Sequence, residues 1–222
     1  MDHFSPHKPT RRALLRATTL CAGALGVMLS TGQAWAQFAS TPAPAPASAN
    51  DPRMADRVVG SPTAKVQVDE WYSLTCPHCA RFAHDVFPEI EEKLIKTGKL
   101  RYVFHEYPLN QVDLMAIMIA RAMPADRYEA FVLALLDSQA IWAFDKNRDS
   151  RDELAKMAAL AGMPRELFDQ TLLDDGLKSA ILAKQEWAEK AYSIQSTPSF
   201  VVNGKTTAGE QTYDEFVKMA GL

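Results

Sequence analysis

The stretch VQVDEWYSLTCPHC, residues 66–79, decides how the rest of the chain is interpreted. Its first half is rich in β-branched and aromatic residues, which predicts a strand over 65–72. Its second half ends in two cysteines, Cys76 and Cys79, just before an apolar pattern of helical period. That pattern consists of Phe82, Val86, Ile90 and Leu94. The cysteine pair is therefore expected where a strand becomes a helix.

The residues that follow predict an α/β fold. Pro88 should kink the helix and Gly98 should end it, and a second strand is expected over 100–107. A strand, a helix and a strand joined by a short return imply a parallel βαβ unit. Residues 111–193 show only helical patterns, and we expect them to form a helical insertion.

Local signals divide the insertion into helices. Pro124 and Pro164 are placed in first turns, and Ser150 with Glu153 matches a capping box. The apolar residues at helical spacing are assigned to the core: Leu114, Ile117, Met118, Phe131, Leu135, Leu154, Met157, Leu160, Leu177 and Ile181.

A hairpin and a helix are predicted after the insertion. Asn203-Gly204 is a strong turn signal between β-prone residues 199–203 and 205–207, and 213–220 has the pattern of a closing helix. The chain therefore consists of a βαβ half, a helical insertion and a ββα half.

The first 36 residues are predicted to be a signal peptide. Basic residues precede an uncharged stretch, 17–29, and Ala34-Trp35-Ala36 fits a cleavage site after Ala36. Those 13 residues are too few to span the ~30 Å of a bilayer. Residues 10–16 resemble a twin-arginine export motif, which leaves both general and twin-arginine export open. Residues 37–54 are rich in Pro and Ala and are assigned to a linker, with a folded domain over 55–222.

Composition sets the class of protein. The chain has 222 residues, 47% of them hydrophobic, which is enough for one principal domain with a core. Its 24 Lys and Arg against 27 Asp and Glu give a net charge of −3 without a basic block, so a nucleic-acid partner is not expected. Cys21 lies in the predicted signal peptide. Cys76 and Cys79 are then the two cysteines left to form a disulfide.

Two cysteines at this spacing predict redox chemistry. Both side chains leave the first turn of a helix and can form a disulfide, and the positive end of the helix dipole favours thiolate there. Cys76 is expected to be the exposed nucleophile and Cys79 the deeper, resolving thiol. His78 beside the sulfur should further stabilise the thiolate, which makes the disulfide a stronger oxidant.

A metal site is the alternative for the same two thiolates. Zinc would need further ligands from His78, His84, His105 or carboxylates, and the sequence has no second Cys-x-x-Cys or His pair at ligand spacing. We therefore predict no metal and no cofactor. A non-catalytic copper or zinc carrier stays as a rival hypothesis.

The chain resembles the DsbA-type thiol:disulfide oxidoreductases of the thioredoxin-like superfamily over residues 55–222. The resemblance rests on the tetrapeptide Cys76-Pro77-His78-Cys79 and on Thr197-Pro198 before a predicted strand. It implies a cis peptide at Pro198 beside Cys76, with the backbone of Thr197 binding a substrate strand.

The same resemblance suggests a role for Glu70, six residues before Cys76. This residue matches an acidic position that exchanges a proton with the inner thiol. The alternative is a solvated carboxylate on a strand, because charged groups are seldom fully buried. His84 and His105 are interpreted as structural or surface residues.

The implied function is a monomeric periplasmic oxidase that passes its disulfide to unfolded or folding exported proteins and is reoxidised by a DsbB-like membrane quinone reductase. One residue departs from many DsbA sequences: Thr197 stands where Val is common before the cis-proline. Thr is frequent there in disulfide isomerases and reductases, which use a DsbD-like reductant. An isomerase or reductase therefore remains an alternative, although 37–60 is too short for a dimerisation domain.

Overall fold

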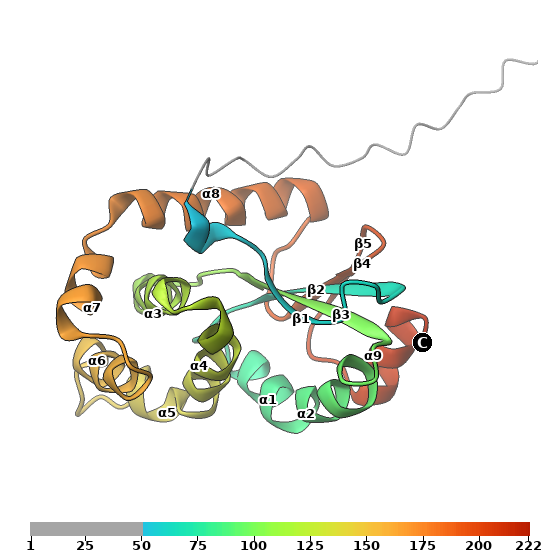
Figure 1. Cartoon of the computed structure of the whole chain (residues 1–222), viewed down its shortest axis with the longest axis horizontal. Helices are drawn as coiled ribbons and strands as arrows, with labels where there is room; N and C mark the ends of the chain where they lie inside the picture. Colours follow the sequence, from blue (N-terminus) through green and yellow to red (C-terminus); the bar gives the residue numbers. More distant parts are fainter. Residues whose placement is uncertain (1–50) are drawn as a thin grey trace, which may run out of the picture. The chain divides into compact units, whose positions relative to one another are not determined.

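The strand that leads to Cys76 lies in the middle of a five-stranded sheet (Figure 1). This strand, β2 (Val66–Tyr72), runs parallel to β3 (Leu100–Glu106) and antiparallel to β4 (Ser199–Val202). The edges are β1 (Arg57–Gly60) beside β3 and β5 (Lys205–Ala208) beside β4, both antiparallel. The predicted parallel βαβ unit is confirmed, and the antiparallel neighbours make the sheet mixed.

The computed structural model describes residues 51–222. The predicted signal peptide, its cleavage after Ala36 and residues 37–50 of the predicted linker lie outside the described residues. Residues 52–54 belong to the fold and not to a linker: they form the 3-10 turn η1 (Pro52–Met54), and Met54 is buried. Arg53 in this turn binds Asp51 and Asp174. The folded domain therefore begins a few residues before the predicted boundary at 55.

The helix after Cys76 is interrupted as Pro88 predicts. It consists of α1 (Pro77–Asp85), α2 (Phe87–Ile90) and a π-helical turn, η2 (Glu91–Ile95), with the break at Val86. Pro88 cannot donate a backbone hydrogen bond, so the helical ladder is broken one turn before it. Gly98, at φ 74°, turns the chain into β3.

The insertion is helical, as predicted, and its described residues form six helices. They are α3 (Gln111–Ala122), α4 (Ala125–Asp137), α5 (Gln139–Trp142), α6 (Ser150–Leu160), α7 (Arg165–Leu172) and α8 (Asp175–Tyr192). Figure 1 shows α3 to α7 grouped beside the sheet, while the long α8 returns across it. The insertion thus forms a helical lobe joined to the sheet by α8.

Helix starts in the insertion are displaced by one residue from their predicted places. Pro124 and Pro164 are N-caps, not first-turn residues. The predicted capping box at Ser150 is wrong: the cap of α6 is Asp149, whose side chain accepts from the Asp152 backbone N–H. Asp and Ser are both favourable N-cap residues, so the sequence alone does not decide between the neighbours Asp149 and Ser150. In the structure the extended backbone at Asp149 makes this residue the N-cap.

The hairpin and the closing helix are as predicted. Asn203 and Gly204 both have positive φ, 50° and 77°, as a tight turn of matching twist requires. Helix α9 (Tyr213–Ala220) follows, with a capping box between Thr212 and Glu215. The second half of the fold is therefore set by short-range signals.

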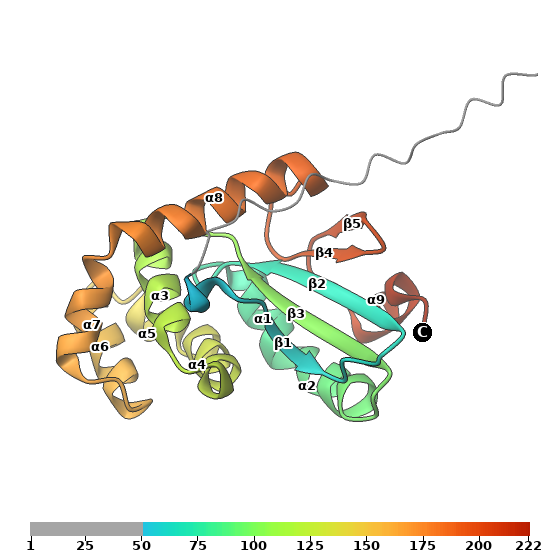
Figure 2. The same cartoon turned by 45° about the horizontal axis from the view of Figure 1, so that its top comes forward.

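Helices cover both faces of the sheet (Figure 2). Helices α1, α2 and α9 lie on one face, where the rings of Phe82, Phe200 and Phe216 pack together. Helix α8 covers the other face, where Trp71 and Val201 pack with Ala188 and Ile194. The sheet is thus buried on both sides at β2, the strand that leads to the cysteines.

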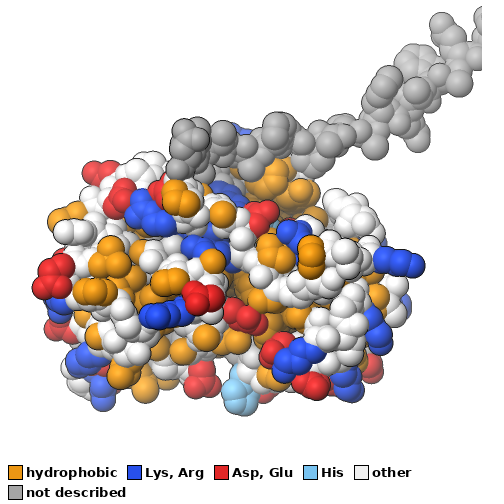
Figure 3. Space-filling model, in the orientation of Figure 1, with side chains coloured by type: hydrophobic (Ala, Val, Ile, Leu, Met, Phe, Trp, Pro, Cys, Tyr) orange, Lys and Arg blue, Asp and Glu red, His pale blue; other side chains and the backbone are white. Residues whose placement is uncertain are grey.

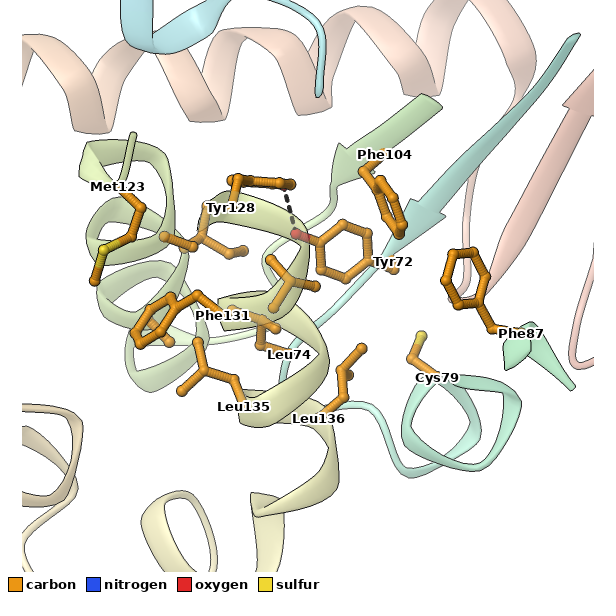
Figure 4. Packing of buried hydrophobic residues seen from close by; sticks show 14 of the residues in the cluster. Tyr72, Leu74, Cys79, Phe87, Phe104, Met123, Tyr128, Phe131, Leu135 and Leu136 are labelled. Atoms are coloured by element: carbon orange, nitrogen blue, oxygen red, sulfur yellow. Dashed lines mark hydrogen bonds between the residues drawn. The ribbon is translucent and has the colours of Figure 1, made fainter. Parts of the chain in front are cut away.

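The core continues from the sheet into the helical lobe (Figure 4). Most apolar residues assigned to the core are buried, as predicted. Met157 is half-buried, and the assignment of Leu160 is wrong because its side chain is 90% exposed at the last residue of α6. Charged side chains of both signs are interspersed on the face in Figure 3. No helix within residues 51–222 is long and apolar enough to cross a membrane.

Candidate active site

Cys76 and Cys79 lie where β2 passes into α1. Cys76 is the N-cap of α1, Pro77 occupies the first turn, and Cys79 lies one turn further in. Both residues are free thiols in the structure, and their exposed fractions are 5% and 1%. Cys79 points into the packed cluster between Leu136 and Phe87 (Figure 4). The predicted order of depth is observed, although Cys76 is less exposed than expected.

The surroundings of Cys76 favour its thiolate. Its pKa falls from 9.0 to about 5, first because the Cys79 thiol donates a hydrogen bond to its sulfur. Burial opposes this change, while hydrogen bonds from the Thr197 side chain and from the backbone N–H groups of Cys79 and His78 add to it. Backbone donors at a helix start are the source of acidity that the sequence predicts.

Cys79 has the opposite character. Burial raises its pKa well above 9.0, and the neighbouring Cys76 and Glu70 raise it further. One thiol of the pair is thus stabilised as thiolate and the other as thiol. In such an asymmetric pair Cys76 is the better leaving group, and Cys79 must gain a proton when its disulfide bond is broken.

The loop before β4 completes the site. The Thr197–Pro198 peptide is cis, as predicted, and the Cys76 thiol lies 3.2 Å from the Thr197 carbonyl oxygen, to which it donates. With Cys76 as a thiol, the Thr197 hydroxyl is buried and has no hydrogen-bond partner within residues 51–222. It can donate to the sulfur when Cys76 is a thiolate, which is how the Thr197 side chain lowers the Cys76 pKa. The pairing of Trp71 with Ser199 holds this loop next to the cysteines.

Glu70 lies beneath the cysteines and is buried, with 5% of its surface exposed, so the alternative of a solvated carboxylate is wrong. Tyr102 donates a hydrogen bond of 2.9 Å to its Oε2. Burial raises the pKa of Glu70 from 4.5 to about 7; the Tyr102 hydrogen bond lowers it, and the charge of Cys76 raises it. The carboxyl group can therefore exchange a proton near neutral pH.

Two residues of the insertion hold the loop before Cys76, and the sequence analysis did not identify them. The buried carboxylate of Asp113 accepts from the Ser73 hydroxyl at 2.5 Å and from the Leu74 backbone N–H at 2.9 Å. The Gln139 amide donates to the carbonyl oxygens of Leu74 and Cys76, at 2.7 and 3.0 Å. The helical lobe thus positions the reactive residue directly.

The histidines have different surroundings. The His78 ring is 60% exposed and contacts Glu210 and Arg81, and His84 is exposed beside Asp85. His105 is buried, stacked on Trp71 and bound to Asp69, which fits a structural residue. Within residues 51–222, no cluster of three or more His, Cys, Asp or Glu side chains could hold a metal ion.

Comparisons with a family model, with curated proteins and with solved structures all point to the same family. A family model described as thioredoxin matches residues 53–220. The thiol:disulfide interchange protein DsbA of Salmonella typhi is 28% identical over 71% of this chain and 73% of its own. The crystal structure of alpha-DsbA1 from Wolbachia pipientis superposes with a TM-score of 0.69 at 28% identity, over 76% of this chain and 90% of that one.

Relatives from Rickettsia are longer. A Rickettsia prowazekii chain, provisionally named a protein-disulfide oxidoreductase, is 35% identical over 68% of this chain and 56% of its own length. The chain therefore spans little more than half of the Rickettsia relatives that it matches.

Proposed function

Because the chain belongs to the thioredoxin family, as a DsbA-type member with a helical insertion, we propose that it is a thiol:disulfide oxidoreductase that introduces disulfides into other proteins. The observation that carries the proposal is the geometry of the pair: Cys76 caps α1 beside the cis Thr197–Pro198 peptide, and Cys79 is buried one turn further in. This geometry lowers the pKa of Cys76 to about 5 and raises that of Cys79 well above 9.0. Stabilisation of the thiolate favours the reduced pair, so the oxidised pair gives its disulfide away readily.

The reaction has two exchange steps. A substrate thiolate attacks the sulfur of Cys76 in the Cys76–Cys79 disulfide, forms a mixed disulfide with Cys76 and displaces Cys79 as thiolate. A second substrate thiolate then attacks the substrate sulfur of the mixed disulfide and releases Cys76. The substrate loses two electrons and gains a disulfide, and the two cysteines gain those electrons as a dithiol. A thiol of low pKa is a good leaving group in the second step.

Glu70 provides the proton for the first step in this proposal. The displaced Cys79 is buried and has a raised pKa, so it must be protonated. Glu70 is buried with it, and burial raises its pKa to about 7, so this carboxyl group can hold a proton near neutral pH and donate it. Thr197 and Pro198 form the wall against which an extended substrate segment would lie.

The setting that we propose is the bacterial periplasm. The predicted signal peptide supports export, and disulfides persist in oxidising compartments of this kind. The substrates would be unfolded or folding exported proteins with free thiols. A DsbB-like membrane quinone reductase would reoxidise the dithiol, and the protein would act as a monomer.

The reduction potential of the Cys76–Cys79 pair tests the direction of electron flow. The purified protein is equilibrated in glutathione buffers of known poise, and the fraction of dithiol is counted by alkylation. We expect a potential near or above about −150 mV, toward the oxidising end of the thiol oxidoreductase scale. A potential below about −230 mV would instead favour the reductase alternative.

Trapping of partners provides a second test. In Cys79→Ser the resolving thiol is absent, so mixed disulfides at Cys76 should accumulate in cells and can be separated under non-reducing conditions. Capture of a quinone-linked membrane protein together with exported proteins is the expected result. Capture of a DsbD-like reductant in its place would contradict the oxidase.

A further inference from the structure

Three polar side chains meet at the rim of the cysteine site. His78 and Arg81 lie in the first turns of α1, and Glu210 lies in the loop between β5 and α9. The Oε2 atom of Glu210 is 3.1 Å from Nδ1 of His78 and 3.0 Å from Nη2 of Arg81. The Nη2 atom of Arg81 is also 2.6 Å from Nδ1 of His78. One ring nitrogen of the histidine therefore has two charged neighbours.

These contacts engage the Nδ1 atom of the His78 ring. A guanidinium group only donates hydrogen bonds and a carboxylate only accepts them. Nδ1 of His78 consequently either accepts from Arg81 or donates to Glu210, and it contacts the pair in both cases. The backbone N–H of His78 donates a hydrogen bond that lowers the pKa of Cys76. The orientation of the His78 ring is thus fixed through Nδ1 by Glu210 and Arg81, and not by the Cys76 sulfur.

We propose that Glu210 is a positioning residue, which together with Arg81 holds the His78 ring away from the Cys76 thiolate and so keeps the disulfide less oxidising than the same tetrapeptide would otherwise be. The proposal rests on the function proposed above. An N–H donated to the thiolate would stabilise the reduced pair, and this stabilisation is withheld while the ring contacts Glu210. Glu210 acts through His78 and does not touch the sulfur.

The test is a change in the equilibrium between the protein disulfide and glutathione. In Glu210→Ala the ring is released, and we expect the equilibrium constant for reduction of the protein disulfide to rise about 3- to 10-fold, or ~15–30 mV. In a His78→Ala background the same substitution should change the constant by less than half as much. Circular dichroism and the urea midpoint check that each variant is folded, and Glu210→Gln provides a second, less disruptive variant.

Asp169 offers a matched control. It is a carboxylate on α7 that also binds two arginines, Arg151 at 2.8 Å and Arg165 at 2.9 Å, and it takes no part in the cysteine site. Asp169→Ala removes a comparable surface ion-pair group and should leave the glutathione equilibrium unchanged. A shift in the Glu210 variant that is absent in the Asp169 variant is therefore specific to the site.

The outcomes separate the two proposals. An equal shift with and without His78 would show that Glu210 acts by its charge alone and would overturn the positioning role, as would an unchanged or lowered constant in Glu210→Ala. If the unchanged protein has an oxidising potential in either of these cases, the proposed function stands. Failure of the unchanged protein to exchange with glutathione would reject the function and this inference together.

Discussion

Replacement of Glu70 by Gln should change how the stability of the reduced protein depends on pH. Glu70 has a folded-state pKa of about 7 against an ordinary 4.5, because it is buried beside the cysteines. The folded protein therefore binds this proton more tightly than the unfolded chain does. The resulting stability is fully present below pH 4.5 and is lost as the pH rises through 7.

The size of the effect follows from that shift. Each pKa unit corresponds to ~1.36 kcal/mol, so a rise from 4.5 to about 7 corresponds to ~3 kcal/mol of unfolding free energy between pH 4.5 and 8. Only 5% of the residue is exposed, so solvent screening reduces this value little. Gln cannot titrate, so the unfolding free energy of the Glu70→Gln variant should lack this pH-dependent contribution.

The two proteins are compared by how their unfolding free energies change with pH, and not by the free energies at a single pH. The Gln side chain keeps an acceptor oxygen for the Tyr102 hydroxyl. Its buried NH2 group gains no hydrogen-bond acceptor, which lowers the unfolding free energy by ~1–3 kcal/mol at every pH. Groups outside the cysteine site titrate equally in both proteins and cancel, and the Cys76→Ser background separates the titration of Cys76, which is coupled to Glu70. The difference in stability should therefore move in favour of the variant by ~3 kcal/mol as the pH rises from 4.5 to 8.

The assay is urea unfolding followed by tryptophan fluorescence, with a reductant present so that both cysteines stay thiols. Glu166→Gln, on the exposed surface of α7, is the control for a carboxylate in water. In a Cys76→Ser background the slope should become smaller, because the charge of Cys76 contributes to the raised pKa. A difference between wild type and Glu70→Gln that stays within ~1 kcal/mol over the whole pH range would refute the reasoning.

Three other substitutions test the site and the core. Cys79→Ala removes the thiol that donates to the Cys76 sulfur, so the pKa of Cys76 should rise from about 5 by roughly one unit or more. The pKa is measured as the midpoint of thiolate absorbance at 240 nm, and an unchanged midpoint would contradict the role of Cys79 as a donor. Thr197→Val removes the buried hydroxyl and should raise the same midpoint by less, so a lowered midpoint would count against it. Arg121→Met leaves the buried Glu106 without its ion-pair partner and should cost ~3–5 kcal/mol in urea unfolding, where a cost below ~1 kcal/mol would argue against the pair.

Local sequence signals were sufficient for most of the fold, and the missed element shows their limit. The Cys-Pro-His-Cys start of α1 and the Asn203-Gly204 hairpin depend on neighbours in the sequence, and both are present as predicted. Strand β1 was not predicted. It has four residues, and its place depends on pairing with β3, where Arg57 faces Phe104. Such a short segment shows no period of its own.

The same distinction applies to the site. Cys76, Cys79 and Thr197-Pro198 could be found because each belongs to a short motif. Asp113 and Gln139 are single polar residues in helical segments, and their partners near Cys76 lie 39 and 63 residues away in the sequence. No local pattern marks a residue whose role is to hold a distant backbone group.

The separation of 121 positions in the sequence between Cys76 and Thr197 has a consequence for a chain that emerges with its N-terminus first. The cysteines leave the ribosome or the export channel long before the Thr197 loop, and β4 cannot pair with β2 until residue 202 has followed. During this interval the nascent chain lacks the wall that completes the surroundings of Cys76. The surroundings that lower the pKa of Cys76 are therefore complete only when nearly the whole chain has been delivered.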